Sequence, residues 1–564
     1  MAHETGKAEA QSPADGTIIR LDALVIGAGF SGLYALQRLR DHLGLDVRIV
    51  ENGSGVGGTW FTNRYPGARC DTESYIYCYS FSRALREEWR WSSKYPLQSE
   101  LLEYFNHVTE RFDLERSIDF NVRVTGAHFD EEINRWRVLT LSGVTYECRY
   151  LVTAMGTLSA VPYTPTVAGI EDFEGEWYHT GAWPADGVDL KGKRIAVIGT
   201  GSTGVQTIPV IAKEAGHLYV FQRSPQYTIP ARHAEVDENT FNRIQSEYDD
   251  IWARARSSTG GFPWQHNGRS AVDESEEDLN ATLEELWSEG GLKFAFGSYR
   301  DLLTDQGAND RVAEFVRAKI RARVGDEELA AKLVPTDHPF GSRRPVIDTE
   351  YFETYNRDNV TLVDLRSEPL VGAVPGGLRT EKADYDIDVI VFATGFDAVT
   401  GPFMRLDIRG RGGETVQEHW ADGPASYLGL MVRGFPNMFT ITGPGSTFGN
   451  HAVTMEHHVE WISDCIEHMR ERGIAAMEPT ADAEEQWGRD LVTQVQQTLV
   501  SKGKSWWSGD NIPGKTPRPL FSVASHKYYR KVCGAVADAE YQEFTKVLDA
   551  GADAGGATRQ HAKV

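Results

Sequence analysis

The chain alternates short apolar runs with helical patterns of apolar residues, and this order predicts an α/β fold. Residues 21–26 and 47–50 are apolar runs of strand length, and residues 33–39 between them place apolar side chains at helical spacing. Later, the runs 195–198 and 217–221 enclose a second glycine-rich turn. In both places the first run ends in a Gly-x-Gly-x-x-Gly turn. Two such units predict two Rossmann-like dinucleotide-binding domains.

The rest of the pattern divides the chain into domains. Residues 225–335 are acidic and helical in pattern, and we interpret them as a helical insertion in the second dinucleotide-binding domain. Residues 388–392 are an apolar run before an Ala-Thr-Gly turn, which we interpret as the return of the chain to the first domain. We therefore expect the first domain at 18–156 and 387–546, the second at 157–224 and 336–386, the insertion at 225–335, and flexible tails at 1–17 and 547–564.

Composition excludes several classes of function. A chain of 564 residues is long enough for two or three domains. The formal net charge of −23 argues against nucleic acid or an anionic membrane as a partner. No apolar run is long enough to span a membrane, and the first residues lack the apolar core of a signal peptide. Five scattered cysteines without a Cys-x-x-Cys pair indicate a reducing cytoplasm and no metal cluster.

The first glycine turn, Gly27-Ala-Gly29-Phe-Ser31-Gly32, lies between a predicted strand and a predicted helix. In that context the glycines allow a pyrophosphate to approach the helix N-terminus closely. The next strand ends in Glu51, whose carboxylate can accept hydrogen bonds from ribose hydroxyls. The following loop, 57–71, combines many glycines with Trp60, Arg69 and Asp71, which favours a flavin over a bare nicotinamide.

The second turn, Gly199-Thr-Gly201-Ser-Thr-Gly204, precedes a strand that ends in Arg223-Ser224 rather than an acidic residue. A cation and a hydroxyl at that position would bind a 2′-phosphate, which favours NADPH over NADH. Arg343 and Arg344, before Pro345, indicate either anion recognition or a surface ion pair.

A stretch between the two units carries unusual chemistry for a linker. It contains Phe173, Gly175, His179 and Trp183 followed by Pro184. We interpret it as a hinge between the two cofactor domains. An amphipathic connector whose aromatic residues pack on a domain edge is the alternative that spacing alone leaves open.

This stretch resembles the fingerprint of the type I Baeyer–Villiger monooxygenases, Phe-x-Gly-x-x-x-His-x-x-x-Trp-Pro, at every fixed position. The loop 57–71 resembles a second signature of that family, Gly-Gly-x-Trp-x-x-x-x-Tyr-Pro-Gly-x-x-x-Asp. Residues 505–515 resemble its Ser-Trp…Asn-x-Pro-Gly-Lys segment, with Asp510 where the family commonly has a small residue. The resemblance extends from about residue 21 to residue 546.

The resemblance implies the site residues. It makes Arg344 and Asp71 catalytic. The residues expected to bind FAD are Gly27, Gly29, Ser31, Gly32, Glu51, Thr59, Trp60, Asp71, Tyr77, Val124 and His451. Those expected to bind NADP are Arg69, Thr200, Gly201, Ser202, Thr203, Gly204, Gln206, Arg223, Ser224, Arg343, Arg344 and Trp506.

The implied activity is NADPH- and O2-dependent oxygenation of a ketone to an ester or lactone through a C4a-peroxyflavin. The expected partners are a small-molecule ketone and O2, and the expected assembly is a monomer or a weak homo-oligomer. A flavin-dependent N- or S-oxygenating monooxygenase is the main alternative. A disulfide reductase is disfavoured because Cys70 and Cys78 are too far apart in the chain. A non-catalytic nucleotide-binding protein would not be reduced by NADPH.

Overall fold

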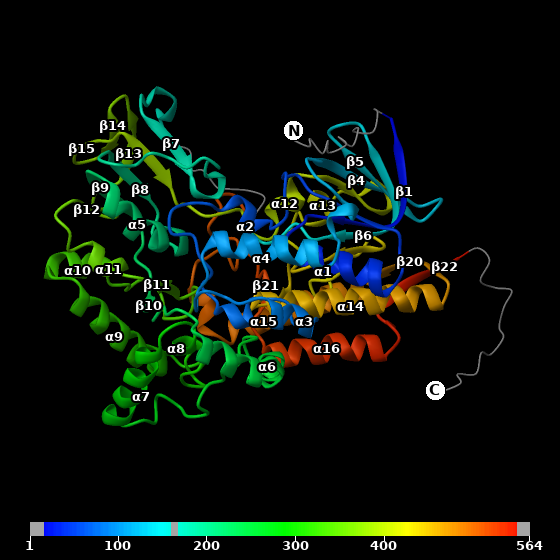
Figure 1. Cartoon of the computed structure of the whole chain (residues 1–564). Helices are drawn as coiled ribbons and strands as arrows, with labels where there is room; N and C mark the ends of the chain where they lie inside the picture. Colours follow the sequence, from blue (N-terminus) through cyan, green and yellow to red (C-terminus); the bar gives the residue numbers. More distant parts are fainter. Residues whose placement is uncertain (1–15, 159–166, 550–564) are drawn as a thin grey trace, which may run out of the picture.

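The computed structural model describes residues 16–158 and 167–549, which form two dinucleotide-binding domains side by side (Figure 1). Their glycine turns are built alike. A Cβ on Gly32 would lie 1.8 Å from the carbonyl oxygen of Gly27, and one on Gly204 would lie 2.2 Å from that of Gly199. In both domains, therefore, the first helix packs on the first strand so closely that only glycine fits.

The first domain is built on an eight-stranded sheet. The sheet order is β17 (Asp407–Arg409), β4 (Val124–Asp130), β5 (Arg135–Thr140), β6 (Thr145–Thr153), β1 (Ile18–Ile26), β2 (Val47–Val50) and β3 (Ile118–Asp119), with β18 (Met438–Thr440) also paired to β6. Strand β5 pairs antiparallel with both of its neighbours, β4 and β6, and all other pairs in this sheet are parallel.

Helices from both halves of the chain cover this sheet. The longest, α14 (His451–Glu471), packs against α1 (Phe30–Leu36), and Asn450 caps its N-terminus. The remaining helices of the domain are α2 (Thr59–Thr62), α3 (Arg83–Glu88), α4 (Gln98–Arg111), α12 (Gly401–Met404), α13 (Val416–His419), α15 (Ala481–Gln496) and α16 (His526–Asp538). Two small pairs complete it, β19 (Ser446–Thr447) with β21 (Phe521–Ser522), and β20 (Ile474–Pro479) with β22 (Phe544–Leu548).

The second domain has a five-stranded, all-parallel sheet with the order β12 (Val360–Asp364), β9 (His217–Gln222), β8 (Arg194–Ile198), β16 (Val389–Phe392) and β7 (Glu176–His179). Helix α5 (Ser202–Glu214) follows β8 directly. The smaller elements are β10 (Thr228–Pro230), β11 (Val346–Asp348), α11 (Tyr351–Thr354), β13 (Leu370–Val374), β14 (Gly377–Thr380) and β15 (Asp384–Asp386).

One domain assignment made from the sequence is wrong. The run around β16 was expected to belong to the first domain, but it lies between β8 and β7 in the second sheet. The chain therefore returns to the first domain after Phe392. The fingerprint stretch was expected to be a hinge, and its residues 176–179 form the edge strand β7 of the same sheet. An apolar run predicts a strand, but its sheet is decided by long-range pairing.

The insertion is helical as expected, but it does not belong to one domain. Helices α7 (Glu276–Glu289), α8 (Lys293–Phe296), α9 (Gln306–Arg323) and α10 (Glu327–Leu333) pack in the core of the second domain. Helix α6 (Glu238–Ser257) instead buries Tyr248, Ile251 and Trp252 in the core of the first domain (Figure 1). The insertion therefore spans both domains.

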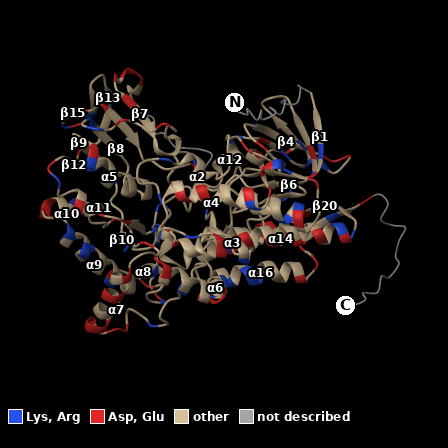
Figure 2. Ribbon diagram, in the orientation of Figure 1, with Lys and Arg blue, Asp and Glu red and all other residues tan. Residues whose placement is uncertain are grey.

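The chain ends and the surface complete the fold. Strand β22 runs to Leu548, so the tail expected from residue 547 begins within a paired strand. Helices α9 and α10 carry charged residues of both signs, whereas the charged residues of α7 are all acidic (Figure 2). Some form ion pairs between helices, such as Arg311 with Glu276. Among the residues that the structure describes, no helix is both long and apolar enough to cross a bilayer.

Candidate active site

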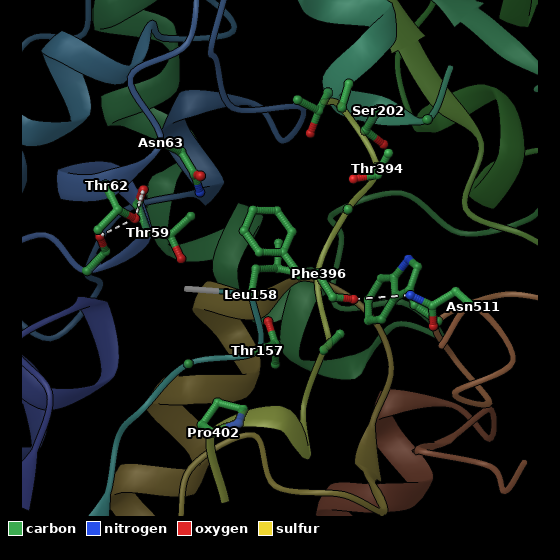
Figure 3. Close-up of a pocket in the computed structure, with 18 of the residues that line it drawn as sticks. Thr59, Thr62, Asn63, Thr157, Leu158, Ser202, Thr394, Phe396, Pro402 and Asn511 are labelled. Carbon is green, nitrogen blue, oxygen red and sulfur yellow. Dashed lines mark hydrogen bonds between the residues drawn. The ribbon is translucent and has the colours of Figure 1, made fainter. Parts of the chain in front are cut away.

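The two glycine turns face one cavity of about 1560 Å³ that both domains line. Figure 3 shows part of it, with Thr59 and Asn63 of the first domain on one side and Ser202 and Thr394 of the second domain on the other. The cavity is lined by every residue expected to bind a cofactor except Gly32 and Gly204. Those two glycines lie behind the turns, where they serve the packing of helix on strand.

The first turn fits a dinucleotide pyrophosphate. Gly27 has φ +105°, and a Cβ there would lie 2.6 Å from the carbonyl oxygen of Ala154. Gly29 precedes α1 and provides no side-chain cap, so the first N–H groups of this helix are free for a phosphate. The Glu51 carboxylate accepts hydrogen bonds from the backbone N–H groups of Ala28 and Gly53, both at 2.7 Å. Glu51 therefore holds the glycine turn in place through these backbone hydrogen bonds. From the sequence, the same carboxylate was expected to accept hydrogen bonds from the ribose hydroxyls.

The second turn fits a second dinucleotide. A Cβ on Gly199 would lie 2.4 Å from the carbonyl oxygen of Ala393, whereas one on Gly201 would meet no atom within 4 Å. Gly201 therefore opens onto free space at the start of α5, and that helix also lacks a side-chain cap. Thr200 donates a hydrogen bond to the carbonyl oxygen of Ser224 at 3.0 Å, which ties the turn to the segment carrying Arg223.

Arg343 and Arg344 are not a surface pair, because both side chains are largely buried beside the cavity. Burial lowers the pKa of Arg343, and the nearby charge of Arg223 lowers it further. Neighbouring arginine side chains are an arrangement that suits an anion. The sequence did not reveal Asp337, whose carboxylate lies 3.9 Å from Arg343 and whose pKa is lowered to about 2, first by its hydrogen bond with His338.

Arg344 reaches across to the first domain. Its Nη2 donates a hydrogen bond to Asp71 Oδ1 at 2.7 Å, while its buried Nε–H has no acceptor among residues 16–158 and 167–549. The pair therefore presents a fixed cation with a free donor beside the cavity. The imidazole of His451 lies nearby, and its pKa is lowered to about 4, mainly by burial and then by Arg344. His451 is therefore neutral near pH 7.

Aromatic side chains and two further segments complete the wall. Trp60 donates a hydrogen bond to the hydroxyl of Tyr77 at 3.1 Å. Trp506 packs edge-on against Phe521, with ring centroids 5.6 Å apart. Its loop is joined to the Ala-Thr-Gly turn of the second domain, because Asn511 donates a hydrogen bond to the carbonyl oxygen of Phe396 at 3.1 Å (Figure 3). Asp510 in this loop accepts a hydrogen bond from Ser508.

The fingerprint residues Phe173, Gly175, His179 and Trp183 do not line the cavity. His179 is buried, and its Nδ1 accepts a hydrogen bond from the backbone N–H of Gly181 at 2.9 Å. Its Nε2 lies 3.4 Å from the hydroxyl of Thr394, which does line the cavity. His179 therefore connects the fingerprint to the Ala-Thr-Gly turn and to Phe396, against which its ring packs edge-on, and both line the cavity.

Asn63 is a site residue that sequence reasoning missed. Its buried side-chain oxygen has no hydrogen-bond partner in the part of the chain that the structure describes, and Asn63 lines the cavity (Figure 3). Its place inside the loop 57–71 was the signal that could have identified it.

Comparisons with known proteins agree with this geometry. Residues 25–89 match the family described as NAD(P)-binding Rossmann-like domain. The chain is 45% identical over 522 residues to a Baeyer–Villiger monooxygenase of Pseudooceanicola batsensis, covering 92% of this chain and 95% of the relative. It is 44% identical over 525 residues to a phenazine N-monooxygenase of Lysobacter antibioticus, covering 93% and 96%.

Solved structures extend the likeness to the whole fold. An oxidized steroid monooxygenase bound to NADP superimposes with a TM-score of 0.89 at 45% identity, covering 94% of this chain and all of that one. The OTEMO complex with FAD and NADP gives a TM-score of 0.90 at 41% identity, covering 93% and 99%. High identity over nearly full length, with two dinucleotide folds around one cavity, establishes that the chain belongs to the Baeyer–Villiger monooxygenases, the FAD- and NADPH-dependent enzymes that insert one oxygen atom next to a ketone carbonyl.

Proposed function

We propose that Arg344 and Asp71 are the catalytic pair with which this enzyme converts a ketone into an ester or lactone. The observation that carries this proposal is the 2.7 Å hydrogen bond that joins the two residues across the domain boundary beside the cavity. Neither domain contains the pair alone. The chemistry therefore depends on the two domains being in the arrangement described above.

The cofactors have separate places along the cavity. The first turn, Glu51 and the loop 57–71 would hold FAD, and the second turn with Arg223 and Arg343 would hold NADPH. When bound, FAD supplies the redox chemistry, taking a hydride from NADPH and activating O2. Arg223 and Arg343 would bind the 2′-phosphate, and Asp337 would then compete with that phosphate for Arg343.

Arg344 would act on the substrate by its charge. When the carbonyl carbon is attacked, negative charge develops on the ketone oxygen, and a fixed guanidinium stabilises that charge without first having to reorganise. Asp71 orients the guanidinium through one N–H group and leaves its other donors free. Because the imidazole of His451 is neutral near pH 7, it adds no further positive charge beside Arg344 and Asp71.

The activity is tested by measuring NADPH consumption against a panel of cyclic, linear, aromatic and steroid-sized ketones, with the ester or lactone identified by mass spectrometry. Small cyclic and linear aliphatic ketones are our first choice. NADPH consumption without an oxygenated product from any ketone would contradict the proposal.

Oxygenation of an aromatic nitrogen is a second candidate, favoured by the similarity to a phenazine N-monooxygenase. Adding phenazines and tertiary amines to the same panel separates the two candidates. An N-oxide formed faster than any ester or lactone would favour the second. We further propose a cytoplasmic location, supported by the five free and buried cysteines, and a monomeric or weakly homo-oligomeric state.

A further inference from the structure

The segment 65–71 of the first domain is attached to the second domain at both of its ends. At one end the Gln206 side chain, on α5, bonds to Tyr65 and Arg69. At the other end Asp71 bonds to Arg344. The segment thus connects α5, which begins at the second glycine turn, to the catalytic pair.

Both ends of the Gln206 amide are used in this attachment. Its Oε1 accepts hydrogen bonds from the Tyr65 hydroxyl at 2.8 Å and from the Arg69 backbone N–H at 3.4 Å. Its Nε2 donates to the Arg69 carbonyl oxygen at 3.1 Å. Only a side-chain amide offers an acceptor and a donor in this arrangement, since glutamate cannot donate and leucine can do neither.

The backbones of the two domains also meet at this point. Gly67 has φ +83°, and a Cβ there would lie 2.4 Å from the carbonyl oxygen of Gln206 and 2.9 Å from Cγ2 of Val210. Thr203, which is also on α5, lies next to the Tyr65 hydroxyl. Positions 203, 206 and 210 share one face of α5, because residues three and four apart lie one above the other on a helix.

We propose that Gln206 is a positioning residue that couples the dinucleotide at the start of α5 to the Asp71–Arg344 pair through the segment 65–71. Any movement of α5 on NADPH binding is transmitted to Arg69 through two hydrogen bonds and from there to Asp71, two residues later. This role differs from the direct contact with NADP expected from the sequence. It rests on the placement of NADPH at the second turn.

The test compares the Gln206→Leu enzyme with the wild type in anaerobic stopped-flow. We expect Gln206→Leu to bind NADPH with nearly unchanged affinity. Flavin reduction at saturating NADPH should slow about tenfold, the size of the net contribution of one or two hydrogen bonds. The change in the flavin spectrum on adding NADP⁺, which involves no turnover, should shrink as well.

Two further variants sharpen the result. Tyr65→Phe removes one of the same bonds without changing the helix, so it should slow reduction by a smaller factor. The double variant should be slowed by less than the product of the two single factors, because both changes remove the shared hydrogen bond between Tyr65 and Gln206. Gln245→Leu is the matched control, since its Nε2 donates to the Arg86 carbonyl oxygen at 2.8 Å and joins α6 to the first domain away from the main cavity. It should leave reduction unchanged.

Three outcomes would overturn the inference. A rise in the NADPH dissociation constant with an unchanged limiting rate would make Gln206 a ligand. If flavin reduction slowed equally in Gln245→Leu, the effect would come from a general loosening of the structure and not from the contact of Gln206 with the segment 65–71. If both Gln206→Leu and Tyr65→Phe kept the wild-type rate of flavin reduction and the wild-type spectral change on adding NADP⁺, the proposed coupling would be wrong. A wild-type enzyme that NADPH does not reduce would instead overturn the cofactor placement, and the inference with it.

Discussion

Replacing Arg344 by alanine separates the two half-reactions of the enzyme. Flavin reduction needs NADPH aligned with the flavin but creates no oxyanion on the ketone, so it should survive the change. Ketone oxygenation should collapse, because the cation that faces the developing charge is gone. The structure places this cation beside the cavity, with a buried Nε–H that has no acceptor among the residues described.

The magnitude follows from the environment of the pair. The side chains of Arg344 and Asp71 are only 20% and 22% exposed, so water screens their charges incompletely. A guanidinium about 4 Å from a unit negative charge attracts it by about 4 kcal/mol at an effective dielectric constant of about 20. Loss of one preorganised donor typically costs about 2.7–4 kcal/mol, or on the order of 10²–10³ in kcat. We expect a loss in this range.

The assay has two parts. Anaerobic stopped-flow follows the bleaching of the flavin by NADPH, and aerobic incubation then measures ester or lactone against hydrogen peroxide. Arg343→Ala is the matched control, since it removes the adjacent guanidinium on the side of Asp337 rather than Asp71. It should raise the dissociation constant of NADPH while ketone oxygenation at saturating NADPH is largely retained.

The unpaired carboxylate of Asp71 is a second effect of the substitution, and the double variant Arg344→Ala with Asp71→Asn isolates it. If repulsion by Asp71 caused the loss, the double variant would recover activity; we expect no recovery. Ester or lactone formation near the wild-type rate in Arg344→Ala would remove Arg344 from the chemistry. Failure of flavin reduction would make it a residue that positions the nicotinamide.

Three further predictions concern other parts of the protein. Arg223→Ala should weaken NADPH binding by about 1–3 kcal/mol, the scale of a hydrogen bond to a charged group, and leave NADH use almost unchanged; equal losses in titrations with both cofactors would contradict the 2′-phosphate assignment. His179→Ala should retain FAD, checked by absorbance, but slow steady-state turnover, because its ring lies 3.4 Å from the Thr394 hydroxyl of the cavity wall; undiminished turnover would leave the fingerprint a packing role only. Burial raises the pKa of Glu456 from 4.5 to about 7, so the native protein binds more protons than the unfolded chain between these values, and stability from this group is lost as the pH rises through 7. Glu456→Gln should therefore gain stability relative to the wild type on going from pH 4.5 to pH 8, by up to about 3 kcal/mol in urea unfolding, and parallel pH profiles for the two proteins would refute the assignment.

The sequence by itself determined the two nucleotide folds and the residues around the cavity. Glycine turns are local requirements of the backbone, so the positions of Gly27 and Gly199 can be predicted without a partner in space. The loop 57–71 and the Arg343–Arg344 pair can also be identified from the sequence, because their residue types indicate what they can bind. Together with the family resemblance, which implied the rest of the expected cofactor residues, these local signals identified residues that nearly all line one cavity.

Tertiary structure alone decided which segments belong together. Strand β16 looks like any apolar run and β7 has no apolar run at all, and only long-range pairing places both in the second sheet. The apolar face of α6 does not specify which core it fills, and it fills that of the first domain. The contact of Gln206 with the segment 65–71 joins residues 137 positions apart. No local pattern encodes such a contact, because it arises only when two separately folded domains meet.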